Sequence, residues 1–150
     1  MLSPILMTCV LAVVTVAIHV GGLTLLLLDL KRVHFLAQTR FWQIARLLVV
    51  MVGCMIVLHL AEILVWSFFY LHWGYLPDAE AAFYFSAVTY ACIGYGDLVL
   101  VKPWRVLAAF EGLIGILMCG LSASVLFAVV SHFHKISARS TTEVRENHEN

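Results

Sequence analysis

FYFSAVTYACIGYGD, residues 83–97, is the stretch of sequence that decides the fold of this chain. It begins as a short apolar run of helical character and ends with two glycines, Gly94 and Gly96, on either side of Tyr95. The run is too short to cross a bilayer, because a spanning helix needs about 20 apolar residues. Irregular backbone is tolerated at membrane depth only where it is buried in protein or lines a water-filled cavity. We therefore expect this stretch to enter a membrane, turn, and leave on the same side.

The composition of the chain indicates a membrane protein. Of its 150 residues, 63% are hydrophobic and 12% are charged, whereas soluble domains are about half apolar. Nine basic and nine acidic residues balance, so the net charge gives no argument for nucleic acid as a partner. The four cysteines lie far apart in the sequence, which argues against a CxxC metal or redox site.

Three long apolar segments surround the re-entrant stretch and are each long enough to span a bilayer. The predicted fold is an all-α membrane protein with three transmembrane helices plus a re-entrant helix and loop. The expected segments are an N-terminal transmembrane helix (1–30), a basic loop (31–46), a module (47–131) and a polar tail (132–150). Within the module we expect an outer helix (47–71), a re-entrant helix (78–91), a loop (92–97) and an inner helix (104–131). We expect the tail to be partly disordered.

Basic residues indicate how the chain crosses the membrane. Residues 31–46 hold four of them, and Lys135 and Arg139 follow the last span. Loops rich in lysine and arginine stay on the cytoplasmic side, so we expect the N-terminus outside and the C-terminus in the cytoplasm. The first span lacks the charged start and short core of a signal peptide, so it is expected to be retained. A short chain without a recognisable regulatory domain favours a plasma membrane, specifically a prokaryotic inner membrane.

Ionisable side chains inside the predicted spans are candidate functional groups, because burying them in a bilayer is costly. His59 and Glu62 lie three residues apart on one helical face, which predicts a buried hydrogen-bonded pair. A metal site would need more ligands than this pair supplies. His19 and Glu111 are each expected to form hydrogen bonds, the first at a helix interface and the second near the re-entrant loop. Proton sensing by these four groups stays open, since histidine titrates near physiological pH.

The outer helix, re-entrant helix, CIGYGD loop and inner helix together resemble the pore module of potassium channels. The resemblance covers roughly residues 47–130, more than half of the chain. In that family a TVGYG loop replaces the hydration shell of potassium with backbone carbonyls. The resemblance implies a potassium-selective channel that conducts K+ passively, with a filter formed by Cys92, Ile93, Gly94, Tyr95 and Gly96 and with K+ bound at the first four of them.

The residue types of the loop suit this role. Repeated carbonyl dipoles bind a cation weakly enough to release it, and glycine adopts at little cost the φ values that point carbonyls inward. The negative C-terminal end of the re-entrant helix would favour a cation. Tyr95 is expected to point outward against that helix, toward Tyr84, Phe85 or Tyr90. One such loop cannot close a ring, so we expect a homotetramer with cyclic symmetry.

Two departures from the family pattern matter. The family usually has threonine where this chain has Cys92, and a thiol is a softer and poorer potassium ligand. Many members bury an acidic residue in the re-entrant helix, where this chain has Val88, so Glu62 or Glu111 is expected to replace it from a flanking helix. The side chains predicted to support the filter are Asp97, Thr89, Tyr84, Phe85, Glu62 and Glu111. Gly115 and Gly120 are either helix-packing positions or a gating hinge.

The sequence is also compatible with two other functions. Because of Cys92, a weakly selective channel for K+ and Na+ is one alternative, and a non-conducting membrane subunit that docks through its first span is another. An enzyme is not expected, since no nucleophile and base meet at a water-accessible place. The absence of an arginine ladder predicts no voltage sensor. No cofactor is expected beyond permeant K+ ions, and the expected partners are further copies of the chain, the lipid bilayer and an unidentified regulatory subunit.

Overall fold

The computed structural model describes residues 2–34 and 41–149. These residues form four α-helices, and no strand occurs within the described ranges. The helices are α1 (Leu2–His34), α2 (Phe41–His72), α3 (Ala79–Tyr90) and α4 (Arg105–Glu149). The predicted all-α fold class is confirmed.

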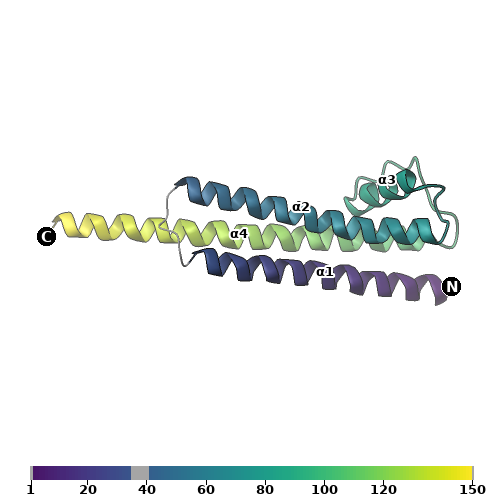
Figure 1. Ribbon diagram of the computed structural model, residues 1–150, viewed down its shortest axis with the longest axis horizontal. Helices are drawn as coiled ribbons and strands as arrows, with labels where there is room; N and C mark the ends of the chain where they lie inside the picture. The colour runs from purple at the N-terminus through teal and green to yellow at the C-terminus, as the bar shows by residue number, and fades with distance from the viewer. Residues whose placement is uncertain (1, 35–40, 150) are drawn as a thin grey trace.

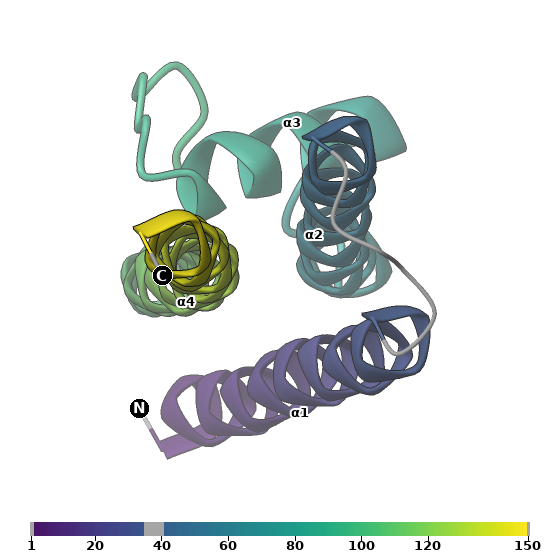
Figure 2. The same ribbon diagram turned by 90° about the vertical axis from the view of Figure 1, so that its left-hand side faces the viewer.

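Three long helices lie side by side, and the short α3 sits at the end of the bundle where α1 begins (Figure 1). Seen along the bundle, α1, α2 and α4 occupy the corners of a triangle (Figure 2). Helix α3 packs on α2 and α4, and α1 packs on the same two helices from the opposite side. The re-entrant segment and the first span are therefore separated by the outer and inner helices of the predicted module.

The three long helices have the length and composition of membrane spans. Their apolar segments are Ile5–Asp29, Trp42–His72 and Arg105–Phe133. Large apolar side chains such as Val13, Val49 and Leu117 are exposed on their surfaces, as expected where lipid replaces water as the solvent. Helix α3 has 12 residues, about 18 Å at 1.5 Å per residue, so it cannot cross. The chain is a multi-pass membrane protein.

The helix ends differ from several expected boundaries. Helix α2 begins at Phe41 rather than at residue 47, and α1 continues to His34, which shortens the expected basic loop. Arg40 of that loop lies outside the described residues. The tail, expected to be partly disordered, continues α4 as helix to Glu149. Residues 121–150 contain neither glycine nor proline, so the chain offers no residue that would end the helix.

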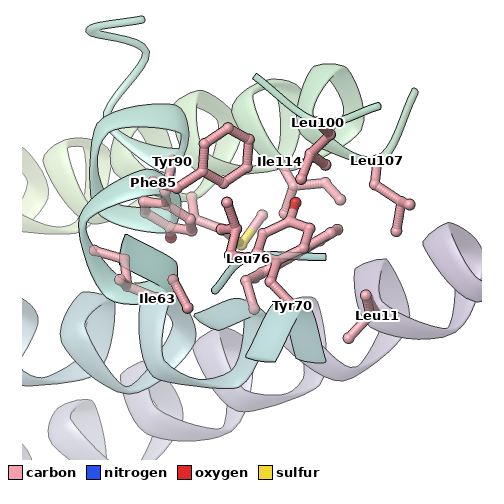
Figure 3. Packing of buried hydrophobic residues seen from close by; sticks show 12 residues of the cluster. Leu11, Ile63, Tyr70, Leu76, Phe85, Tyr90, Leu100, Leu107 and Ile114 are labelled. Carbon is pink, nitrogen blue, oxygen red and sulfur yellow. The ribbon is translucent and has the colours of Figure 1, made fainter. Parts of the chain in front are cut away.

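The main hydrophobic core lies around α3, where all four helices contribute side chains (Figure 3). The rings of Tyr70 and Phe85 meet edge to face, with their centroids 5.2 Å apart. Trp66 and Leu107 are also fully buried here. A second, smaller cluster includes Leu23, Met51, Met55, Val129 and Phe133. The larger cluster fixes α3, and with it the loop that follows, against the bundle.

Candidate functional site

Local sequence sets both ends of α3. Asp78 adopts an extended N-cap conformation, and its carboxylate accepts a hydrogen bond from the amide of Ala81 at 2.8 Å. An aspartate in this position satisfies an amide that has no partner inside the helix. At the other end, the Val88 carbonyl accepts the amides of Ile93 at 2.9 Å and Gly94 at 3.3 Å. The CIGYGD loop is thus held by its amides to the carbonyl end of α3.

The backbone of this loop alternates in handedness. The φ angles of Cys92, Gly94 and Gly96 are +56°, +59° and +79°, whereas Ile93 and Tyr95 do not have positive φ. Alternating left- and right-handed residues turn successive peptide groups the same way, which collects like groups on one side of the chain. The amides of Cys92, Ile93 and Gly94 donate to carbonyls of α3, and the carbonyls of residues 92–96 accept no backbone hydrogen bond from the described part of the chain. Their oxygens are therefore available as ligands for a group from outside the chain.

Cys92 is strained and engaged with α4. A residue other than glycine at φ +56° costs roughly 1–2 kcal/mol, and such strain concentrates at functional sites. Its thiol donates to the carbonyl oxygen of Gly112 at 3.2 Å. The thiol, which the sequence left as a candidate ligand at the inner end of the loop, is thereby partnered by the inner helix.

The outer end of the loop is tied to α3 by a side-chain hydrogen bond. The hydroxyl of Tyr84 donates to Asp97 Oδ2 at 2.8 Å. This bond lowers the pKa of Asp97 below its ordinary value and raises the pKa of Tyr84, because it stabilises the carboxylate and the neutral phenol. Both residues were predicted to support the filter, and the structure joins them directly.

Two of the three residues expected to contact Tyr95 have partners on α2 in the single chain. Phe85 packs on Tyr70 of α2, and the Tyr90 hydroxyl bonds to groups on α2. Both belong to the face of α3 that is buried against the bundle, so neither faces the loop. Tyr84 bonds to Asp97 instead. The side chain of Tyr95 is 70% exposed on the single chain.

Glu111 links three helices, α2, α3 and α4, through hydrogen bonds. It is fully buried, and its Oε2 accepts from the Tyr70 hydroxyl at 2.6 Å while its Oε1 lies 2.5 Å from Ser86 Oγ. The hydroxyl of Ser86 also lies 3.0 Å from the carbonyl of Ile63. The Ser86 hydroxyl has one hydrogen, but both the Ile63 carbonyl and Glu111 Oε1 lie within hydrogen-bond distance of it. Both of these contacts are hydrogen bonds only when Glu111 is protonated and donates to Ser86, which then donates to Ile63. The expectation that Glu111 bonds near the re-entrant segment is confirmed.

Glu111→Ala is expected to destabilise the protein, whereas Glu111→Gln is not. Alanine leaves the buried Tyr70 hydroxyl without an acceptor, which costs about 1–3 kcal/mol in the free energy of unfolding. Glutamine can still accept from Tyr70 and donate to Ser86. The thermal unfolding midpoints of the two variants in lipid nanodiscs measure the difference. Equal midpoints for Glu111→Ala and the native chain would contradict this role.

Glu62 bonds to different partners from the one expected. Its Oε1 lies 2.7 Å from Nδ1 of His19, and its Oε2 accepts from the Tyr90 hydroxyl. Nδ1 of His59 is 3.7 Å from the carboxylate, too far for a hydrogen bond, and instead lies 3.0 Å from the Tyr90 hydroxyl. The predicted His59–Glu62 pair is thus wrong as a direct bond, because Tyr90 lies between them. The expected interface bond of His19 is confirmed.

The same cluster could suggest a metal ion, because ligand atoms of His19, His59 and Glu62 lie within 4.8 Å of one another. The third group comes from α1, which the spacing of residues 59 and 62 could not reveal. However, His19 and Glu62 are 2.7 Å apart. Two ligands bonded at about 2.0–2.1 Å to one tetrahedral ion would be roughly 3.3 Å apart. The observed distance is that of a hydrogen bond.

A family model described as an ion channel matches residues 46–132, more than half of the chain. The chain belongs to this ion channel family. The match begins in α2 and ends in α4, so it includes α3 and the CIGYGD loop. No curated protein and no solved structure matched the chain. Helix α1 lies outside the family match and is an addition to the channel module.

The glycines of the inner helix of the channel serve different purposes. A Cβ atom on Gly115 would collide with the carbonyl group of Tyr90, and one on Gly112 would lie 3.3 Å from the Thr89 carbonyl oxygen. A Cβ on Gly120 would meet nothing within 4 Å. Of the two predicted roles of Gly115, helix packing or a gating hinge, close packing therefore fits the structure. Thr89 contributes through its carbonyl, which accepts the amide of Cys92 at 2.9 Å.

Proposed function

We propose that the chain is a potassium-selective channel in which the CIGYGD loop is the selectivity filter. The observation that carries this proposal is the alternation of φ at Cys92, Gly94 and Gly96 with the amides held by α3. The free carbonyls are ligands of the kind that replace the hydration shell of potassium. The residues proposed to bind K+ are Cys92, Ile93, Gly94 and Tyr95, with Gly96 closing the outer end.

Charge at the inner end of the loop favours a cation. The carbonyl end of a helix carries a partial negative charge, and α3 ends at Tyr90, two positions before Cys92. No side chain of the loop itself carries a positive charge. A cation that has lost part of its water would therefore be stabilised where α3 points.

We further propose that four chains assemble around the pore. Ile93 and Tyr95 are 54% and 70% exposed on the single chain, and one row of carbonyls can contact only one side of an ion. Cyclic symmetry would surround the ion with carbonyls and cover these side chains with neighbouring chains. The proposed orientation in the plasma membrane has the N-terminus outside and the C-terminus in the cytoplasm, which places the filter at the outer face.

A weakly selective channel for K+ and Na+ is the second candidate, and one observation favours it. The Cys92 thiol donates to Gly112, and its sulfur is a softer and poorer K+ ligand than the hydroxyl oxygen of threonine. A poorer ligand at the innermost site would weaken the preference for K+ over Na+.

The test is the reversal potential of purified protein in planar bilayers with K+ and Na+ on opposite sides. We expect the reversal potential to follow the K+ gradient, because the carbonyl row is built by the backbone and survives the change from threonine to cysteine. A reversal potential near zero would favour the weakly selective channel. A silent protein that enters the bilayer would favour the non-conducting subunit. Cys92→Thr is the matched variant, and it should raise selectivity only if the thiol is responsible for a loss.

A further inference from the structure

Five hydrogen bonds around Glu62 form a closed ring that joins all four helices. The ring runs from Glu62 Oε1 to His19 Nδ1 at 2.7 Å, and from His19 Nε2 to Ser122 Oγ at 3.3 Å. It continues from Ser122 Oγ to His59 Nε2 at 3.2 Å and from His59 Nδ1 to the Tyr90 hydroxyl at 3.0 Å. The Tyr90 hydroxyl donates to Glu62 Oε2 and closes the ring. Each member therefore bonds to two others.

Counting protons defines the charge of this ring. Five bonds need five hydrogens, one in each bond. Neutral histidines supply one each, and the hydroxyls of Tyr90 and Ser122 supply one each, which makes four. The fifth must be carried by the His19–Glu62 pair, either on the carboxyl or on the imidazole. In both cases the complete ring has no net charge, which suits a site inside a bilayer.

We propose that this ring is a proton-binding site that couples α1, the first span, to the C-terminal end of α3. Its ligand is one proton, held between His19 of α1 and Glu62 of α2. When that proton leaves, one of the five bonds has acceptors at both ends, and a net negative charge remains among buried groups. Both changes favour opening of the ring.

The ring reaches the pore through Tyr90, the last residue of α3. Tyr90 is held by Glu62 and His59 on one side, and the backbone of Gly115 packs against its carbonyl on the other. The Val88 carbonyl that holds the filter amides lies one half-turn earlier on α3. Opening of the ring would release the end of the helix on which the loop depends, so potassium flux should fall as the pH rises.

Among the described residues, two other titratable groups lie close enough to act on this ring electrostatically. Cys119 of α4 acts on Tyr90 and Glu62, and Glu111 of α4 acts on Tyr90. The carboxyl of Glu111 is engaged with Tyr70 and Ser86 in a separate cluster. The ring itself takes its titratable groups from α1, α2 and α3, and α4 contributes the hydroxyl of Ser122.

The proton site can be tested without ion flux. The ring nitrogens of His19 and His59 are followed by ¹⁵N magnetic resonance of the labelled, full-length protein in lipid vesicles from about pH 6 to about pH 10. Groups that share one proton should titrate together, so we expect the ¹⁵N chemical shifts of both imidazoles to change with one common midpoint. Glu62→Gln should abolish that common step, because an amide can donate to His19 and accept from Tyr90 at every pH. Independent midpoints, or a common step that persists in Glu62→Gln, would overturn the proposal.

The coupling to the pore rests on the function proposed above and needs a flux measurement. We expect K+ flux of the native protein in liposomes to fall roughly fivefold or more from about pH 7 to about pH 10, within the usual range of coupling between sites. Glu62→Gln should show no such fall. Glu80→Gln is the matched control, since Glu80 is an exposed carboxylate on α3, and it should keep the native pH dependence. Retention of the fall in Glu62→Gln, or its loss in Glu80→Gln, would refute the coupling. A protein with the common histidine step but without flux would refute the channel function and leave the proton site standing.

Discussion

Replacing Gly94 with alanine is expected to abolish selective potassium flux. Gly94 has φ +59°, and its amide bonds to the Val88 carbonyl. An alanine held in this conformation costs roughly 1–2 kcal/mol, so four copies in a tetramer would cost about 4–8 kcal/mol. The peptide can relieve this strain by rotating, and the rotation takes its carbonyl out of the row that binds the ion. The measurement is the K+ to Na+ permeability ratio in bilayers, together with the amplitude of the K+ current.

Gly74→Ala is the matched control for this experiment. Gly74 has φ +66°, and a Cβ atom there, as at Gly94, would meet nothing within 4 Å. The backbone strain is therefore similar, but Gly74 lies in the loop between α2 and α3. We expect Gly74→Ala to keep selectivity and to lose only stability. If Gly94→Ala conducted K+ as selectively as the control, the loop would not be the filter.

Replacing Gly115 with alanine is expected to push α4 away from α3. A Cβ atom there would collide with the Tyr90 carbonyl oxygen and would lie 2.9 Å from its carbonyl carbon. Backbone atoms cannot rotate away as a flexible side chain can, so α4 must move. Overpacking of this kind costs about 1–3 kcal/mol in the free energy of unfolding. The thermal midpoint of the purified protein should fall, and K+ flux should fall with it because Tyr90 ends the helix that holds the proposed filter.

Gly120→Ala gives the opposite expectation on the same helix. Nothing lies within 4 Å of a Cβ at this position, and alanine is favoured over glycine inside a helix by about 1 kcal/mol. The thermal midpoint should therefore stay constant or rise. A midpoint that falls equally in both variants would show that close packing on Tyr90 is not the reason for glycine at position 115. A fall in flux without loss of stability in Gly120→Ala would instead indicate a hinge.

Helix α1 contributes more to the site than its place outside the family match indicates. It supplies His19 to the buried ring, and the hydroxyl of its Thr15 accepts a hydrogen bond from the indole of Trp66 at 3.0 Å. Both bonds are fully buried between α1 and α2. A helix that only anchored the protein in lipid would not need buried polar groups, which are costly in a bilayer. These bonds are specific attachments of α1 to the outer helix of the module.

Sequence reasoning recovered the parts of the molecule that local composition controls. Apolar length predicted the three spans and the short re-entrant helix, and all four appear as α1, α2, α4 and α3. The glycines at 94 and 96, expected to adopt unusual φ angles, do have positive φ, because this conformation depends on a few neighbouring residues. Helix ends were less accurate, since the chain between residues 121 and 150 gave no signal for a stop.

The amino-acid sequence by itself determined the class of the protein, its spans and the loop with alternating glycines, because each depends on residues close together in the chain. Only the tertiary structure decided which side chains meet. His19 and Ser122 are 103 positions apart, and Tyr90 is separated from Glu62 by 28. Spacing on one helix pointed to a pair of His59 and Glu62, whereas the packing of α1, α3 and α4 on α2 inserted Tyr90 between them and supplied His19 and Ser122. Hydrogen bonds between helices depend on how whole helices pack, and the order of residues along one helix does not contain that information.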